Sequence, residues 1–179
     1  MSTIIFITGG ERSGKSSFAQ QLALKFTDKP IYLATARVWD NDFAHRIEHH
    51  KNERNEQWTT IEEEKKLSRH NLAGKVVVLD CITLWLTNIF ADNNFDYEKT
   101  LNEAKNEWER LIAQDVTLIV VTNEIGMSLH AQTDSARKFV ELQGRINQYI
   151  ADMAKDAYLM VSGISMKIKY SPHPLPFSQ

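Results

Sequence analysis

The residues with the clearest chemical meaning lie between Gly9 and Ser16, close to the N-terminus. Their order, Gly-Gly-Glu-Arg-Ser-Gly-Lys-Ser, fits the G-x-x-x-x-G-K-[ST] pattern of a phosphate-binding loop. Glycines let such a loop turn its backbone N–H groups around a phosphate, and the following helix adds its positive N-terminal end. We expect Lys15 to neutralise the β and γ phosphates and the Ser16 hydroxyl to ligate Mg²⁺. The expected nucleotide-binding residues are Gly9, Gly10, Glu11, Arg12, Ser13, Gly14, Lys15 and Ser16.

A carboxylate at the end of a neighbouring strand usually accompanies a phosphate loop, and Asp80 is the candidate. It closes the apolar run Val76–Leu79, so we expect it at the same edge of the sheet as the loop. Its carboxylate would hold Mg²⁺ directly or through water. An aspartate in this position can also cap the helix that follows, and the sequence leaves both interpretations open.

Three of the six histidines, His45, His49 and His50, gather in residues 42–54. A neutral imidazole can attack an α-phosphate and form a phosphoramidate, which splits one transfer into two steps. His45 and His49 also fit the H-x-x-E-H pattern of inverted zinc proteases, but that interpretation needs a third ligand and gives the loop no role. Residue types alone favour a third interpretation, a solvated helix face of mixed charge.

Short apolar runs alternate with segments of helical periodicity, and this alternation predicts the elements that must position these residues. The predicted strands span residues 3–8, 30–34, 58–61, 75–80, 116–122, 157–162 and 165–169. The predicted helices span residues 16–26, 42–54, 97–113 and 135–155. Near-continuous apolar strands between helices favour an α/β fold with a mostly parallel sheet, here a three-layer α/β/α P-loop NTPase of RecA-like type. We expect one domain, residues 1–169, and a Pro-rich tail, residues 170–179.

Composition narrows the class of protein. The chain of 179 residues carries a net charge of −2, so no basic excess favours binding to nucleic acid. Its single cysteine, Cys81, lies in an apolar run, which suits a reducing compartment. No run approaches the roughly 18 apolar residues of a membrane span, so we expect a cytoplasmic protein. The strand at 116–122 is followed by Asn-Glu-Ile-Gly rather than Asn-Lys-x-Asp, which argues against a switch GTPase.

Seven motifs, taken in order, are similar to those of one family. They are Thr8–Ser16, Tyr32–Thr35, Arg46–Lys51, Asp80–Thr83, Thr122–Gly126, Gly144–Gln148 and Val161–Ile164. With them the chain resembles the bifunctional adenosylcobinamide kinase/adenosylcobinamide-phosphate guanylyltransferases of cobalamin biosynthesis, from the first strand to about Lys169. The phosphate loop alone is generic, whereas the combination with Arg-Ile-x-His-His-Lys is specific.

The resemblance implies two reactions with Mg²⁺ as cofactor. ATP or GTP phosphorylates the aminopropanol hydroxyl of adenosylcobinamide, and GTP then donates GMP to adenosylcobinamide phosphate, which releases pyrophosphate. The GMP passes through a covalent histidine intermediate, a role that the resemblance assigns to His49. His50 is the alternative nucleophile, but adjacent helical residues point about 100° apart, so both cannot face the phosphate equally.

Further site residues follow from the same resemblance. Family members often have Glu at the position of Asp80. The side chain of Asp is one methylene shorter than that of Glu, so direct contact of Asp80 with the metal is less secure. Glu62 would complete the site, although it can also be only an exposed charge in an acidic run. Thr35, Ala36 and Arg37, just after the second predicted strand, would line the guanine nucleotide site, and His50, Lys51, Asn52 and Glu53 would help to place the nucleotide. The resemblance also implies a homotrimer that takes adenosylcobinamide and adenosylcobinamide phosphate as small-molecule substrates.

Three other functions remain open on sequence grounds. The first is a kinase that uses the loop without the histidine, and the second is a non-enzymatic nucleotide-dependent regulator or assembly subunit. The third is a RecA-like motor on nucleic acid, which the acidic balance of the chain disfavours.

Overall fold

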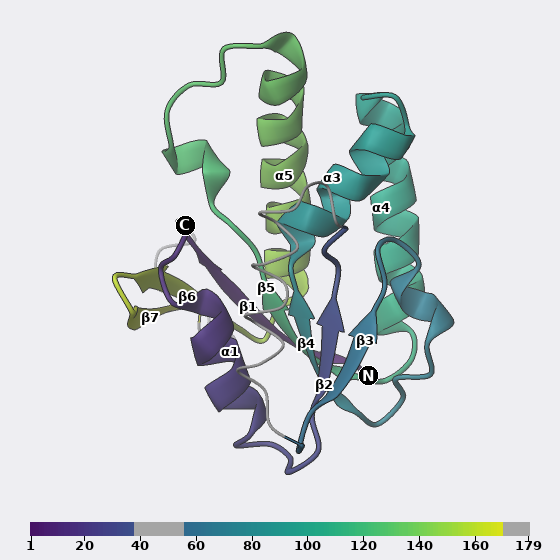
Figure 1. Ribbon diagram of the computed structural model, residues 1–179, viewed down its shortest axis with the longest axis vertical. Coiled ribbons are helices and arrows are strands. Elements are labelled where there is room, and N and C mark those ends of the chain that lie inside the picture. Colours follow the sequence, from purple (N-terminus) through teal and green to yellow (C-terminus); the bar gives the residue numbers. More distant parts are fainter. Residues whose placement is uncertain (38–55, 170–179) are drawn as a thin grey trace, which may run out of the picture.

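Seven strands form one sheet in the computed structural model, which describes residues 1–37 and 56–169 (Figure 1). The strands are β1 (Thr3–Gly9), β2 (Ile31–Ala34), β3 (Thr59–Glu62), β4 (Val76–Asp80), β5 (Thr117–Val121), β6 (Asp156–Val161) and β7 (Ile164–Lys169). Their order across the sheet is β3-β2-β4-β5-β1-β6-β7. Every neighbouring pair is parallel except the β6–β7 hairpin. The carboxyl ends of the parallel strands therefore meet at one edge, where the loops that follow them come together.

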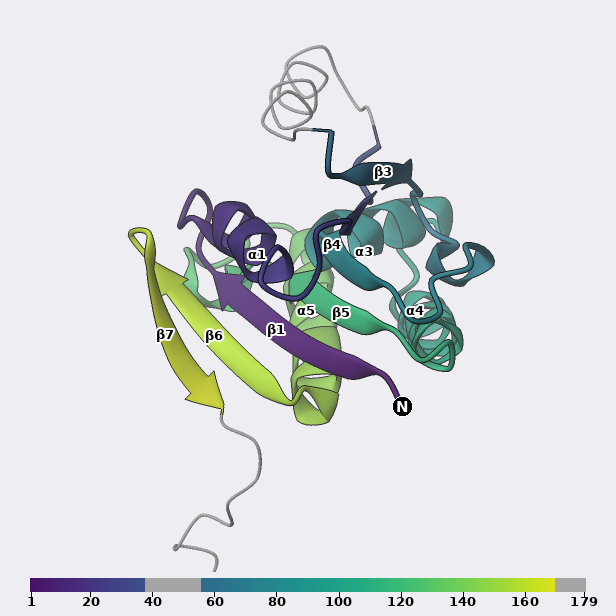
Figure 2. The same ribbon diagram turned by 90° about the horizontal axis from the view of Figure 1, so that it is seen from below.

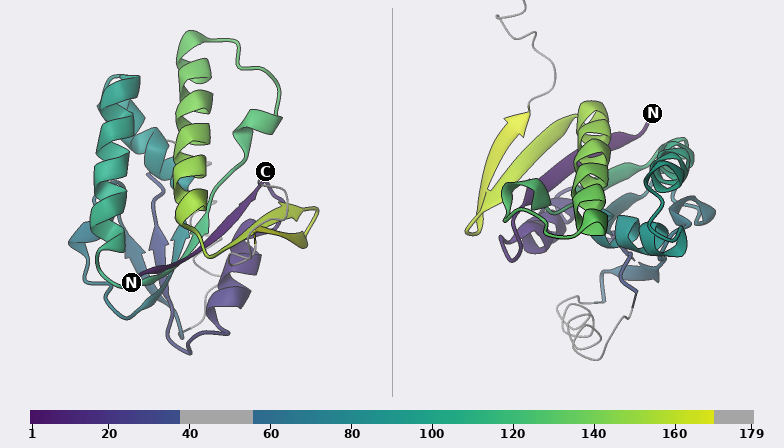
Figure 3. Two further views of the ribbon diagram at one scale, coloured as in Figure 1. Left: turned by 180° about the vertical axis from the view of Figure 1, so that it is seen from behind. Right: turned by 90° about the horizontal axis from the view of Figure 1, so that it is seen from above.

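Helices cover both faces of this sheet (Figures 2 and 3). Helix α1 (Lys15–Ala23) packs on one face, and α3 (Ile82–Asp92), α4 (Tyr97–Ile112) and α5 (Asp134–Met153) pack on the other. Because strand side chains alternate, β1 serves both cores: Ile4 and Phe6 join the α3–α5 side, and their neighbours join the α1 side. Two short 3₁₀ helices, η1 (Leu67–Arg69) and η2 (Ile125–Met127), complete the described part.

The predicted fold class is confirmed, and the predicted strands are found within about two residues of their observed ends. Helix α3 was not predicted, because it is buried on several sides and shows no clear apolar stripe. Helix α1 ends at Ala23, earlier than the predicted residue 26, and Phe26 lies beyond it with 53% of its surface exposed. The predicted helix 42–54 and the tail 170–179 lie outside the described residues, and the domain boundary at residue 169 stays a prediction.

No helix among the described residues combines the length and the apolar character that crossing a membrane requires.

The centre of the sheet gives a test of the core. Leu79 on β4 is fully buried, so Leu79→Ala should lower the free energy of unfolding by about 2–5 kcal/mol, from lost burial and the cavity that remains. Urea unfolding followed by circular dichroism measures the change. Leu129 is 96% exposed, and Leu129→Ala should stay within about 0.5 kcal/mol of the parent. Equal losses in the two variants would contradict this core.

Candidate nucleotide-binding site

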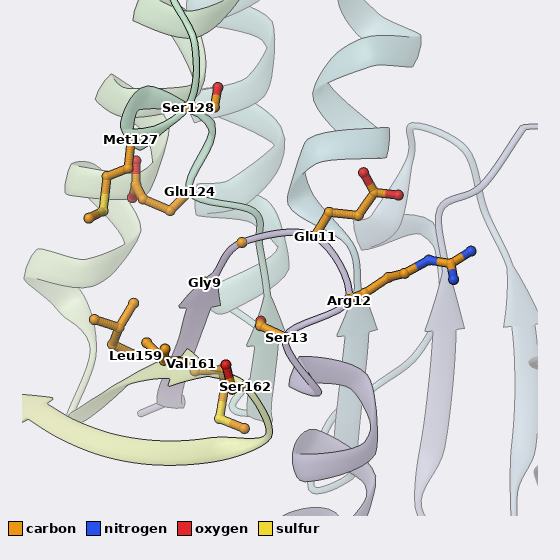
Figure 4. A pocket seen from close by; sticks show the side chains of 12 residues that line it. Gly9, Glu11, Arg12, Ser13, Glu124, Met127, Ser128, Leu159, Val161 and Ser162 are labelled. Atoms are coloured by element: carbon orange, nitrogen blue, oxygen red, sulfur yellow. The ribbon is translucent and has the colours of Figure 1, made fainter.

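The phosphate loop joins β1 to α1 at the carboxyl edge of the sheet (Figure 4). Gly9 and Gly14 have φ angles of +150° and +92°, which residues with side chains rarely adopt. A Cβ atom on Gly9 would lie 2.5 Å from the carbonyl oxygen of Met160 on β6, and one on Gly14 would lie 3.2 Å from the Cα of Gly163. Glycine at these two positions therefore lets the β6–β7 hairpin approach the loop closely.

Backbone hydrogen bonds hold the loop by its carbonyl groups. The Gly9 carbonyl accepts from the N–H of Glu124, at 3.0 Å, and the Ser13 carbonyl accepts from the N–H of Gly163, also at 3.0 Å. Gly163 and Ser162 form the two-residue β6–β7 turn, and both have positive φ, as in a type I′ turn. Anchorage through carbonyls suits a loop whose N–H groups are its anion-binding groups.

Lys15 lies inside the site, with only 7% of its surface exposed. Its Nζ donates to the Gly10 carbonyl at 2.5 Å and to the Ser13 hydroxyl at 3.4 Å. Burial lowers the pKa of Lys15, and the charges of nearby acidic groups, Asp80 among them, oppose that shift. Lys15 and the strand-end carboxylate are thus within electrostatic reach of each other, as the sequence predicts for a triphosphate site. Ser16, the next residue of α1, is half-buried.

Asp80 is held by a partner that the sequence did not reveal. Its Oδ2 accepts a hydrogen bond of 2.5 Å from the phenol of Tyr32, one strand away on β2. Helix α3 begins at Ile82, and its N-cap residue is Cys81 rather than Asp80, with no side-chain cap, so the alternative that Asp80 caps this helix is wrong. Asp80 and Ser16 supply the oxygen atoms that Mg²⁺ prefers, and Mg²⁺ commonly uses one or two protein groups together with substrate phosphates. The described residues contain no cluster of three or more His, Cys, Asp or Glu side chains that could hold a metal alone.

The ends of strands β3, β2 and β4 form a row of aligned positions. Glu62 on β3, Ala34 on β2 and Asp80 on β4 are in register, so their side chains leave the sheet on the same face. Two strand spacings separate Glu62 from Asp80, or about 10 Å. Glu62 is exposed, whereas its neighbour Glu63 turns inward and accepts hydrogen bonds from two backbone N–H groups. The predicted place of Glu62 near the site is therefore compatible with the sheet, while its contact with a nucleotide stays a prediction.

Thr35 is fully buried, and its hydroxyl exchanges two hydrogen bonds of 2.8 Å with the backbone N–H and carbonyl of Cys81. Its own N–H donates to the Asp80 carbonyl at 3.1 Å, and its carbonyl accepts from the Asn88 amide at 2.8 Å. These bonds join the ends of β2 and β4 and give Thr35 a structural role. Its expected contact with guanine, like that of Ala36, stays a prediction.

Arg37 lies at the centre of a charged network beside the C-terminal end of α3. Its Nε donates to Glu64 at 2.6 Å, and its two terminal nitrogens donate to Asp92 at 2.8 and 3.1 Å. Lys65 also reaches Asp92, at 2.5 Å, and these hydrogen-bonded cations hold the pKa of that carboxyl well below its usual range. The network ties the segment after β2 to the C-terminal end of α3.

A buried polar cluster supports the other side of the loop. The Gln143 amide donates to the Thr122 hydroxyl at 2.7 Å, and that hydroxyl donates to Asn147 at 2.8 Å. Asn147 in turn donates to the Asn123 carbonyl at 3.3 Å. The cluster thus joins α5 to the segment after β5, which carries Glu124. The sequence signal was present in the polar residues that follow an apolar strand and in the i, i+4 spacing of the two amide residues.

The predicted nucleophile lies outside the described residues. His49, and with it His50, Lys51, Asn52 and Glu53, belongs to the stretch 38–55. The structure brings together the loop, Asp80 and the strand-end row, and the histidine assignment stays a prediction.

Comparison with known proteins gives one consistent result. The family model CobU, cobinamide kinase / cobinamide phosphate guanyltransferase, matches residues 5–168. The bifunctional adenosylcobalamin biosynthesis protein CobU of Escherichia coli (strain K12) is 36% identical over 181 residues, which cover 93% of this chain and 99% of that protein. The similarly named CobP of Pseudomonas aeruginosa is 32% identical and covers 93% of this chain and 97% of its own length.

Solved structures are more distant. The flagellar accessory protein FlaH from Methanocaldococcus jannaschii is 13% identical at a TM-score of 0.47, over 94% of this chain and 79% of that one. The RadB recombinase is 16% identical at a TM-score of 0.44, over 88% and 73%. The fold class follows from the strand order and the helical layers of this chain.

The close approach at Gly9 can be tested directly. Gly9→Ala should lower the affinity for nucleotide by at least about tenfold, since the new Cβ would force β6 and the loop apart. Titration with a fluorescent ATP analogue measures this loss. Gly144 in α5 has open space around its Cα, so Gly144→Ala should leave affinity unchanged and stabilise the protein by up to about 1 kcal/mol. Unchanged affinity in Gly9→Ala would contradict the described packing.

Cys81 offers a chemical probe of the same site. Burial, followed by the charge of Asp80, raises the pKa of this thiol to about 12, so at pH 8 only about 1 in 10⁴ molecules carries the thiolate. We expect Cys81 to react with Ellman's reagent at least about a hundredfold more slowly in the native protein than in urea. Raising the pH from 7 to 9 should speed labelling of the native protein in proportion to the thiolate fraction. Rapid labelling at neutral pH without unfolding would show that the thiol is accessible.

Proposed function

We propose that one phosphate loop of this protein serves two reactions. The chain belongs to the cobinamide kinase / cobinamide phosphate guanyltransferase family, and these are the two reactions of that family. The enzyme first phosphorylates adenosylcobinamide with ATP or GTP, and then transfers GMP from GTP to adenosylcobinamide phosphate. The observation that carries the proposal is the buried Lys15 at the loop, within electrostatic reach of the strand-end carboxylate of Asp80. A loop that only completed a turn would not require a buried lysine.

In the kinase step the acceptor hydroxyl oxygen attacks the γ-phosphorus of the nucleotide. The bond from the γ-phosphorus to the bridging oxygen breaks, the nucleoside diphosphate leaves, and the hydroxyl proton passes to solvent. Lys15 and the N–H groups of the loop stabilise the charge that develops on the departing diphosphate. Ser16 and Asp80 would hold Mg²⁺, which neutralises charge on the β and γ oxygens when bound.

In the guanylyl step an imidazole nitrogen of His49 attacks the α-phosphorus of GTP, and the bond to pyrophosphate breaks. The same loop grips the departing pyrophosphate, so Lys15 again meets developing negative charge. A phosphate oxygen of adenosylcobinamide phosphate then attacks the α-phosphorus, and the P–N bond breaks to release adenosylcobinamide-GDP and His49. The identity of the nucleophile is supported by the motif Arg-Ile-x-His-His-Lys and by the chemistry of neutral imidazole.

The remaining assignments share this basis in the family. Thr35, Ala36 and Arg37 form the segment that lines the guanine nucleotide. Thr35 contributes by holding this segment in place through its buried hydrogen bonds. Glu62 and the segment 50–53 complete that part of the site. The active enzyme is a cytoplasmic homotrimer that takes corrinoids as small-molecule substrates.

His49→Asn separates the two reactions. Incubation of the parent with Mg²⁺ and GTP should give a GMP adduct that is acid-labile and base-stable, visible by mass spectrometry of the intact protein. His49→Asn should form no adduct and should keep its kinase activity, because the γ-phosphoryl transfer does not use the histidine. His130 is exposed and is distant from His49 in the sequence. His130→Asn therefore serves as a matched control and should keep the adduct. An adduct on His49→Asn would move the nucleophile to another residue.

A further inference from the structure

A cavity of about 390 Å³ opens beside the phosphate loop, on the side of β6 (Figure 4). One wall is the loop itself, and the opposite wall consists of side chains from the segment after β5 and from β6. The wall opposite the loop includes Glu124, Met127, Ser128, Leu159, Val161 and Ser162. No residue expected to bind guanine from the row of β2 and β3 ends contributes to it.

The strand order places the cavity and Asp80 on opposite sides of the phosphate loop. Asp80 ends β4, which lies two places from β1, while β6 adjoins β1 on the other side. The lysine of a phosphate loop meets the β and γ phosphates, and the strand-end carboxylate would hold Mg²⁺, whose charge would favour the γ end of a phosphoryl donor on that side. The γ end of a phosphoryl donor therefore faces β4. A donor bound in this direction extends its nucleoside away from β4, toward β6 and the cavity.

The size and lining of the cavity suit a nucleoside. Ligand pockets of about 300–1,000 Å³ are mostly apolar with a few placed polar groups, and this cavity has that character. Met127, Leu159 and Val161 offer apolar surface for the flat faces of a purine. A corrinoid is much larger than a nucleoside and would leave most of its ring outside a cavity of this volume.

Glu124 is the polar group in position to orient the nucleoside. Its backbone N–H is bonded to the Gly9 carbonyl, so the residue moves with the loop. Its carboxylate lies near Gly126, where a Cβ atom would come within 3.3 Å of Oε1, so the glycine leaves room for this side chain. An ionised carboxylate accepts hydrogen bonds only, which matches the ribose hydroxyls and the amino groups of a purine.

The residues expected to bind guanine lie on the other flank of the loop. Thr35–Arg37 follow β2 and Glu62 ends β3, both beyond Asp80 when counted from the loop. A nucleotide whose guanine occupied that row would place its nucleoside on the side opposite to the cavity. A single nucleoside position cannot satisfy both directions.

We propose that the cavity is a second nucleoside site, which binds the purine nucleoside of the phosphoryl donor in the kinase step. The GTP that reacts with His49 places its guanine along the β2 and β3 ends instead, so the two reactions bind triphosphate to the loop in opposite directions. This inference rests on the proposed function of two reactions at one loop.

Val161→Glu tests the inference by placing a charge in the apolar wall. We expect the KM for ATP in the phosphorylation of adenosylcobinamide to rise at least tenfold, because the carboxylate repels the triphosphate and replaces apolar surface. Formation of the GMP adduct from Mg²⁺ and GTP should change by less than twofold in the same preparation. Ile168→Glu is the matched control: Ile168 is 55% exposed on the same hairpin, against 49% for Val161, and lies outside the cavity.

Photolabelling gives an independent readout that needs no turnover. His49→Asn protein, which cannot form the adduct, is irradiated with 8-azido-ATP and Mg²⁺ and then digested for mass spectrometry. Labels should fall on peptides that contain Met127 or residues 159–162, and excess ATP should prevent them. Labels confined to residues 31–37 and 56–62 would overturn the second site.

The kinetic outcomes separate this inference from the function beneath it. Equal impairment of phosphorylation and adduct formation in Val161→Glu, or equal effects of Val161→Glu and Ile168→Glu, would overturn the inference and leave the two reactions in place. A parent enzyme that forms no adduct and phosphorylates no adenosylcobinamide would overturn the proposed function and the second site together.

Discussion

The close contact between Gly9 and β6 is the constraint on which the rest of the site depends. Gly9 at the end of β1 lies so close to the Met160 carbonyl that no Cβ atom fits. The carbonyl of Gly9 also accepts a hydrogen bond from the N–H of Glu124. A third element, the β6–β7 turn, reaches the loop through the N–H of Gly163. The two residues of this turn have positive φ, and the turn brings the N–H of Gly163 to the Ser13 carbonyl. The β6–β7 hairpin therefore holds the phosphate loop in addition to forming the edge of the sheet.

Burying charged groups at the carboxyl edge of the sheet costs free energy, and fixed hydrogen-bonding and charged partners offset that cost. Lys15 is buried in a site that lowers its pKa, and it meets the Gly10 carbonyl and the charge of Asp80. A buried polar group without such partners would cost about 1–3 kcal/mol. The same reasoning explains why Tyr32 reaches across a strand to Asp80. The bonds of Thr35 to Cys81 satisfy backbone groups where β2 and β4 end.

Features that depend on local spacing could be predicted from the sequence, and those that depend on distant partners could not. The loop is a continuous pattern, and Asp80 follows an unbroken apolar run, so both could be placed. The bond from Tyr32 to Asp80 joins residues 48 positions apart, and no local pattern encodes it. In the run Glu62–Glu64 the sequence offers three equivalent carboxylates, and only the register and the backbone donors show that Glu63 turns inward.

A phosphate loop recognises its ligand through backbone N–H groups and one lysine, and these groups do not distinguish the direction in which a triphosphate runs. Direction must therefore be set by the flanks of the loop. Toward β4 and β2 the flank is charged and built on aligned strand ends, with Asp80, Glu62 and the Arg37 network. Toward β6 it is largely apolar with one carboxylate, Glu124, tied to the loop. Flanks of such different character favour different ends of a nucleotide, which allows one anion site to expose either the γ or the α phosphorus to attack.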